Sequence, residues 1–387
     1  MAVKVDLLPS YSIGRYFQLA ALALYKPMLV RESLILDRAD EYFQLIKSVL
    51  ERIVELKTGS RIVLTPSSWC ELIRGLSDKI EKPRFKYNWT VDSDFAKKLE
   101  TETVRDCEVS DGDVYHLIVL YLKKVSEKGV SAMRVKLPML LRSTVFGRVR
   151  GPHAVEIEET SIDSVGLAIL GSLASYLGRI KIGKSSYEYY IIPDGSYSSL
   201  NYFAPILEVL GGALGEGRYS IPAVISKSLI NAGGISLDLA SYLAALINLL
   251  RSAEVTERAL GLASNRAFES ILLTRLEVSE NRPQVAWIGS LTISEALINI
   301  KEKGLDAVLR KLYQLIQEGI GVRGLTTAVS TCLNSISVAI LVATTGPTRS
   351  SALLDCARSL APLLDERDVP KELKDLVRST LESLMRG

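Results

Sequence analysis

Histidine is scarce in this chain, with only two in 387 residues, and this limits the acid–base and metal chemistry the chain can perform. His116 lies in the apolar stretch VYHLIVLYL, where a core or boundary imidazole is expected, and His153 follows a Gly-Pro turn. Neither belongs to a His-Asp pair, an H-x-x-x-H or a C-x-x-C, and no serine stands in a G-x-S-x-G elbow. The sequence therefore predicts a protein that is not an enzyme and that carries no cofactor.

Acidic residues cluster once in a way that could hold a metal, in the segment EIEET. Glu156, Glu158 and Glu159 supply the carboxylates there. An exposed strand end is the favoured interpretation of this segment, with a metal site as the alternative.

Cysteine and long apolar runs are also in short supply. The four cysteines have neither metal nor disulfide spacing, which predicts isolated buried thiols in a reduced compartment; they are Cys70, Cys107, Cys332 and Cys356. Apolar stretches are broken well before the roughly 18 residues that a membrane span needs. The start, MAVKVDLLPSYS, lacks the basic region and apolar core of a signal peptide. We expect a cytoplasmic protein with no membrane contact. The small number of glutamines, five in the whole chain, favours a thermophilic source.

Positive charge is concentrated in one segment, although the net charge of the whole chain is only +3. Between Lys123 and Arg150 eight basic residues face one acid, Glu127. Within this segment RVKL and FGRVR alternate basic and apolar residues, which on a strand places the basic side chains on one face. Lysine and arginine neutralise phosphates, so the pattern predicts nucleic-acid contact. The basic residues assigned to this contact are Arg134, Lys136, Arg142, Arg148 and Arg150.

A second basic stretch, KIEKPRFKYNW, interleaves cations with aromatic residues, the mixture that binds single strands by charge and stacking. Its assigned binding residues are Lys82, Arg84 and Lys86. For both segments an ordinary solvated surface is the alternative.

The stretch GRIKIGKS, from Gly178 to Ser185, spells the P-loop pattern G-x-x-x-x-G-K-S. A phosphate loop needs a strand before it and a helix after it. Here the upstream sequence has helical periodicity, with Ser161 and Asp163 as candidate caps, and the downstream SSYEYYIIPDG is strand-like. We therefore predict a helix, a glycine turn and then a strand or hairpin, and we keep a P-loop nucleotide hydrolase as an alternative.

Element patterns predict an α+β fold: a mixed N-terminal α/β region with short strands and hairpins, followed by a C-terminal all-helical bundle. Helices are expected in SIGRYFQLAALALYKP and in DRADEYFQLIKSVLERIVELKTG, which ends at Gly59. The segment ESILLTRLEVSENRPQVAWIGSLTI is predicted to form two strands joined at Ser279–Pro283. Beyond Ser294 every segment is predicted to be helical, with nearly balanced charge. In GLDAVLRKLYQLIQEGIG the helical repeat places an apolar stripe on one face, formed by Leu305, Val308, Leu309, Leu312 and Ile316. The predicted domains are residues 1–293, which contact nucleic acid, and residues 294–387, an antiparallel four-helix bundle.

The chain resembles the large subunit of subtype I-A CRISPR interference (Cascade) complexes. The features that carry the resemblance are this hairpin, the helical tail after it, the helix-rich opening and the length of the chain. The resemblance covers general architecture and involves no short motif. It implies a non-enzymatic subunit in antiviral defence that contacts the protospacer-adjacent motif, CRISPR RNA and target DNA. It also implies partners: the backbone and small subunits of the complex and the helicase-nuclease of the same system. Such a role agrees with the scarcity of catalytic residues in the chain, because in RNA-guided systems base pairing between guide and target recognises the target sequence. A nucleic-acid-free structural scaffold is the remaining alternative.

Overall fold

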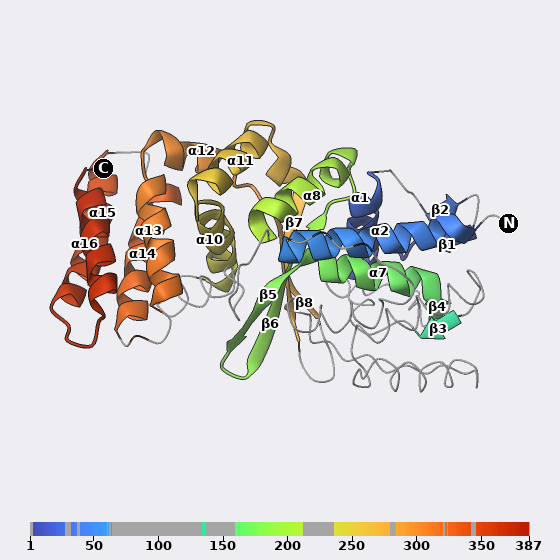
Figure 1. The fold of residues 1–387 in the computed structure, drawn as a ribbon, viewed down its shortest axis with the longest axis horizontal. Coiled ribbons are helices and arrows are strands. Elements are labelled where there is room, and N and C mark those ends of the chain that lie inside the picture. Colours follow the sequence, from blue (N-terminus) through green and yellow to red (C-terminus); the bar gives the residue numbers. More distant parts are fainter. Residues whose placement is uncertain are drawn as a thin grey trace. The chain divides into compact units, whose positions relative to one another are not determined.

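The computed structural model describes residues 3–27, 32–36, 39–59, 61, 63, 134–136, 159–211, 236–278, 284–319, 322, 324–341 and 346–386 (Figure 1). The chain divides into two compact units. Unit 1 comprises Met1–Arg218 and Ser270–Ser290, and unit 2 comprises Tyr219–Glu269 and Leu291–Gly387.

The described helices of unit 1 are α1 (Ile13–Tyr25), α2 (Ala39–Thr58), α7 (Ile162–Ser175) and α8 (Tyr197–Gly211). The Ser12 hydroxyl caps α1 by accepting a hydrogen bond from Gly14 N at 3.1 Å, and α2 ends at Gly59, whose φ of 69° is the left-handed conformation that terminates helices. Both helices were predicted from the sequence.

Helices α1 and α7 approach each other closely at Gly171. A Cβ atom on Gly171 would lie 1.6 Å from the carbonyl oxygen of Phe17, so no larger residue fits without moving a backbone. Glycine at this position sets the distance between the two helices, which is the main helix contact of unit 1.

Three antiparallel sheets lie in the described part of unit 1. Strand β1 (Val3–Asp6) pairs with β2 (Ser33–Leu36), and β3 (Arg134–Lys136) pairs with β4 (Glu159–Ser161). The largest sheet has the order β5-β6-β7-β8, and its strands are Tyr176–Ile182, Ser185–Pro193, Ile271–Glu277 and Gln284–Ser290. The predicted hairpin at residues 271–290 is confirmed as β7 and β8.

Aromatic side chains join the helices of unit 1 to the large sheet. The ring of Tyr190 on β6 lies 5.2 Å from that of Phe17 on α1 and 5.5 Å from that of Tyr176 on β5, measured between centroids. Helices α1, α7 and α8 all contact β6. The core of unit 1 therefore lies where these helices pack against β6 of the large sheet.

Unit 2 is helical in its described part. Its elements are α10 (Leu237–Leu249), α11 (Ala253–Ser264), α12 (Ser294–Glu302), α13 (Asp306–Glu318), α14 (Leu325–Leu341), α15 (Gly346–Leu360), the 3-10 helix η3 (Ala361–Leu364) and α16 (Lys371–Arg386). A further 3-10 helix, η2 (Ala267–Ser270), follows α11. Helices α13 to α16 contact one another in a closed ring, α13 touching α14 and α16, and α15 touching α14 and α16.

The apolar stripe predicted for residues 305–316 is buried as expected. Its members are Leu305, Val308, Leu309, Leu312 and Ile316. Periodicity at the helical repeat therefore identified the core face of α13 correctly.

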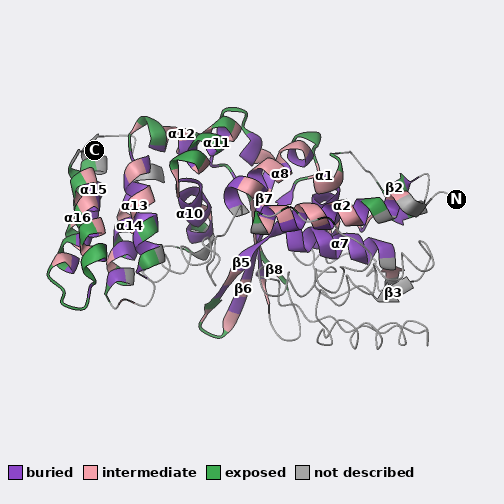
Figure 2. Cartoon of the chain, in the orientation of Figure 1, coloured by how far each residue is buried: buried purple, intermediate pink, exposed green. Residues whose placement is uncertain are grey.

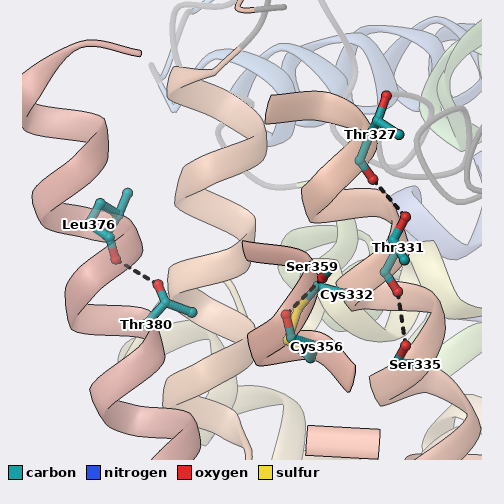
Figure 3. The surroundings of a disulfide bond; sticks show 8 residues. All are labelled: Thr327, Thr331, Cys332, Ser335, Cys356, Ser359, Leu376 and Thr380. Atoms are coloured by element: carbon teal, nitrogen blue, oxygen red, sulfur yellow. Dashed lines mark hydrogen bonds between the residues drawn. A yellow bond between two sulfur atoms is a disulfide. The ribbon is translucent and has the colours of Figure 1, made fainter. Parts of the chain in front are cut away.

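Cys332 and Cys356 form a disulfide bond, contrary to the prediction of isolated thiols (Figure 3). Cys332 lies on α14 and Cys356 on α15, both fully buried and 24 positions apart in sequence. The packing of the two helices brings the cysteines together, which spacing in the sequence does not reveal. Two of the four cysteines thus give no support for a reduced compartment, whereas Cys70 and Cys107 lie outside the described residues.

The α+β class is confirmed by the mixture of antiparallel sheets and helices in unit 1 and by the helices that follow. None of the helices in the described ranges is long and apolar enough to cross a membrane. The division into domains at Ser294 stays a prediction about independent folding. In the structure α10 and α11, which precede that position, belong to the same compact unit as α12–α16.

Candidate nucleic-acid interface

Two of the eight predicted binding residues, Arg134 and Lys136, lie in the described structure, on strand β3. The other six lie outside the described residues: Arg142, Arg148, Arg150, Lys82, Arg84 and Lys86. The interface can therefore be built only around β3 and its partner strand.

The register of this two-stranded ribbon places an acidic residue opposite one of the predicted cations. Glu159 is the partner of Lys136, and Ser161 is the partner of Arg134. Directly opposed residues of an antiparallel pair are neighbours across the strands. The pairing of β3 with β4 thus brings the backbone of Glu159 opposite that of Lys136, although the basic segment itself contains only one acid, Glu127. Glu159 also opens β4, as expected for a strand end; Glu156 and Glu158 lie outside the described residues.

Strand β4 runs directly into α7, so the ribbon is joined to the core of unit 1. Ser161 ends the strand and caps the helix, accepting a hydrogen bond from Ser164 N at 3.2 Å. The sequence predicted this cap. The Ser164 hydroxyl in turn donates to the carbonyl of Asp6 on β1. Hydrogen bonds thus fix the end of the ribbon to two neighbouring elements.

A buried glutamine strengthens the same junction. Gln18 on α1 is fully buried; its Oε1 accepts from Leu8 N at 2.7 Å and its Nε2 donates to Ser164 O at 3.0 Å. Both ends of the amide are satisfied, which burial requires. Sequence reasoning did not single out Gln18, because a lone glutamine in an apolar helix carries no pattern that points to its partners.

Tyr42 makes a third link to the start of α7. Its hydroxyl donates to the carbonyl of Asp163 at 3.0 Å, and the side chain is fully buried on α2. Burial, and secondarily the Asp163 charge, raises the pKa of Tyr42 well above its ordinary value, so the phenol stays protonated and keeps donating. The β3–β4 ribbon therefore starts from a rigid base.

The P-loop spelling forms a β-hairpin, whereas the sequence predicted a glycine turn here followed by a strand or hairpin. Gly178–Ile182 belong to β5, Gly183 and Lys184 form the turn, and β6 begins at Ser185. Ile182 pairs with Ser185 across the turn. A P-loop lysine is followed at once by a helix whose N-terminus faces the phosphates, but a strand follows here. The predicted helix before it ends at Ser175, and Tyr176 and Leu177 already belong to the strand.

A buried acid–phenol pair lies at the centre of the sheet. Glu188 and Tyr190 on β6 are both fully buried, and the Tyr190 hydroxyl donates to Glu188 Oε2 at 2.6 Å. Burial, followed by the Glu188 charge, raises the pKa of Tyr190 well above 10. Because neither side chain reaches the surface, the pair supports the core and cannot contact a macromolecule.

A mainly apolar groove of about 590 Å³ lies in unit 2 between α15, η3 and α16. Its lining residues are Ala357, Arg358, Ala361, Arg378, Leu381, Glu382 and Met385. Within the described ranges no group of three His, Cys, Asp or Glu residues lies close enough to hold a metal ion. His116 and His153 lie outside those ranges.

Comparison with models of known protein families and with characterised proteins finds no match for this chain. Its function therefore has to be inferred from charge and structure.

Proposed function

We propose that the chain is a non-enzymatic large subunit of a CRISPR RNA-guided DNA-interference complex. In this role it contacts the protospacer-adjacent motif and the nucleic-acid backbone, and it docks other subunits. The observation that carries the proposal is the basic segment Lys123–Arg150, part of which forms β3. Such a segment suits phosphate contact because each cation that meets a phosphate releases counterions.

Two further features support the proposal. The β3–β4 ribbon is anchored to α7 and β1 through Ser161 and Ser164, which suits a surface that must present cations in a fixed position. Residues 294–387 carry twelve basic and eleven acidic residues, a balance that suits packing against other proteins. The scarcity of catalytic residue types in the sequence agrees with a binding role, since paired RNA carries the specificity in such systems.

No observation favours the P-loop alternative, because the motif forms a hairpin. That alternative expects ATP binding that disappears in Lys184→Ala, and we expect no ATP binding by the wild type. Equilibrium binding of labelled ATP to wild type and variant measures this directly.

Purification of the native protein from its source tests the proposal first. We expect short RNA and fellow subunits to co-purify with it. Recovery of the chain alone, without RNA and without salt-dependent DNA binding, would contradict the proposal and favour the structural scaffold.

Salt titrations test the basic segment itself. Arg142→Gln and Arg148→Gln should each weaken DNA binding and lower the log–log salt slope by roughly 0.7 to 0.9. Lys371→Gln on the exposed start of α16 serves as a control with the same change of charge and should leave the slope as in wild type. If all three variants behave alike, the segment is only a solvated surface.

A further inference from the structure

The β5–β6 hairpin carries a second basic surface that the sequence analysis did not assign. We call residues 179–186 the hairpin tip. Burial decreases along the strands towards it: residues 188–193 of β6 are buried, whereas Lys181, Gly183 and Lys184 are exposed (Figure 2). Lys181 and Lys184 are therefore open to solvent, whereas Ile180 and Ser186 within the tip are buried.

The charge of the hairpin tip has one sign. It contains Arg179, Lys181 and Lys184 and no acidic residue. The next acid along β6 is Glu188, which is fully buried and accepts a hydrogen bond from Tyr190. Arg179 Nε donates to Ser186 Oγ at 2.8 Å. Within the described part of the chain, neither lysine of the tip takes part in an ion pair.

The neighbouring acid on β7 is already engaged. Glu277 Oε1 accepts from Ser185 Oγ at 2.7 Å, and Glu277 Oε2 accepts from Gln284 Nε2 at 3.3 Å. These two hydrogen bonds hold the Glu277 carboxylate at the base of the turn. The carboxylate forms no ion pair with either lysine of the tip.

The turn holds the two lysines in a defined arrangement. Gly183 has a φ of 59°, and Ile182 pairs with Ser185 and Lys181 with Ser186. A two-residue turn with glycine first matches the twist of the flanking strands, so register continues to the end of the hairpin. A rigid support reduces the entropy lost when the side chains bind a ligand.

We propose that the hairpin tip contacts the phosphodiester backbone of a nucleic acid, an inference that rests on the proposed function. Lysine ammonium groups meet phosphates as point charges. Base stacking is not part of the contact: the tip itself contains no aromatic residue, and the ring of Tyr187, the next residue along β6, is half-buried with the Arg275 guanidinium 5.4 Å from its centroid. Binding at the tip is therefore independent of base sequence.

The test is the double variant Lys181→Gln/Lys184→Gln in the full chain. Binding is measured over a series of salt concentrations to one labelled mixed-sequence oligonucleotide as single-stranded RNA, single-stranded DNA and duplex DNA. We expect the log–log slope to fall by roughly 0.7 per lysine for single strands and roughly 0.9 for the duplex. The tip contacts the probe for which the slope falls by the full amount expected for that type of strand, whereas a probe that it does not contact keeps the wild-type slope.

Two control variants separate a local contact from an effect of net charge. Lys371→Gln/Lys374→Gln on α16 removes the same charge from unit 2 and should keep the wild-type slope. Lys181→Arg/Lys184→Arg keeps the charge of the tip and should also keep the slope. The far-ultraviolet circular dichroism of all variants should match wild type, because both tip lysines are exposed.

The outcomes distinguish this inference from the proposed function. One outcome is that wild type binds with salt dependence while the tip variant has the same salt slope. Another is that the tip and α16 variants lower the slope by the same amount. In either case the hairpin tip is not a contact and the proposed function stands. If wild type shows no salt-dependent binding to any of the three probes, both are overturned.

Discussion

Gly171 shows how a single residue determines the packing of unit 1. The backbone of α7 passes so close to Phe17 on α1 that only a hydrogen atom fits between them. The sequence does not reveal such a close approach, because a glycine within an apolar helix indicates only a weak helix former. The helices that it joins carry Gln18 and Ser164, so the same contact also supports the β3–β4 ribbon.

Gly171→Ala should destabilise the protein by about 1 to 3 kcal/mol, because the added methyl group overlaps a backbone carbonyl that cannot move freely. Urea unfolding measures the change. Gly261→Ala on α11 is the matched control: no atom lies within 4 Å of its added Cβ. Alanine is the better helix former, so this control should gain about 0.5 to 1 kcal/mol. Equal effects at the two sites would show that the α1–α7 contact is not tight.

Asp306 is a second residue with a measurable role, at the junction of α12 and α13. Its Oδ2 lies 3.0 Å from Lys301 Nζ and 2.8 Å from Arg310 Nη2. Burial alone raises the pKa of Asp306, but the hydrogen bond from Lys301 and the charge of Arg310 outweigh it, so the pKa lies below its usual 3.8. The carboxylate also stands in the first turn of α13, where the helix dipole favours negative charge.

Asp306→Asn should cost about 1 to 2 kcal/mol at neutral pH. A lowered folded-state pKa stabilises the protein above the unfolded pKa, and this contribution is lost as pH falls through the folded-state value. The gap in stability between wild type and variant should therefore close below about pH 4. Thermal melting across this range measures it. Asp375→Asn, which breaks an exposed pair with Arg378, should cost less than about 0.5 kcal/mol. A gap that is constant with pH would contradict this role of the Asp306 charge.

At the scale of elements, α14 and α15 are joined both by packing and by a covalent bond. The disulfide between Cys332 and Cys356 is surrounded by hydroxyl groups that bond back to their own helices, such as Ser359 to Cys356 O at 2.7 Å (Figure 3). Helix periodicity predicted each helix, but it does not determine which residues of two helices meet.

Cys332→Ser/Cys356→Ser should lower the stability of the oxidised protein by about 3 kcal/mol, because the bond restricts a loop of roughly 24 residues in the unfolded chain. Urea unfolding with and without reductant measures this. Reduction of denatured wild type should also release two more thiols than reduction of the denatured variant. Equal thiol release from the two proteins would show that these cysteines are not bonded.

At the scale of the whole molecule, the sequence placed a domain boundary at Ser294, whereas compactness groups α10 and α11 with the helices that follow. Helix α11 contacts α12, and α10 contacts α13. These contacts join helices that precede the predicted boundary to helices that follow it. In the sequence, the β7–β8 hairpin separates the two groups of helices. No local feature of the composition at residues 236–264 predicts these contacts.

A fragment of residues 294–387 should be helical with little or no strand, and circular dichroism measures this. It should also unfold at lower urea than the full chain, because α12 and α13 lose their contacts with α11 and α10. Substantial sheet content would refute the predicted bundle, and a midpoint equal to that of the full chain would support an independent domain from Ser294.

Local patterns in the sequence were sufficient to predict the helices α1, α2, α7 and α13, the cap at Ser161, a strand or hairpin after the glycine turn at residues 178–185, and the two strands within residues 269–293. These features depend on side-chain periodicity, capping chemistry and turn residues, all of which act within a few positions along the chain. Of the candidate site, the sequence supplied the charges, of which only Arg134 and Lys136 are placed by the structure. Tertiary structure alone decided that Cys332 meets Cys356, that Glu159 lies opposite Lys136 and that Gly171 packs on Phe17. Each of these contacts joins residues more than twenty positions apart, and burial of a shared core brings such residues together without any local signal.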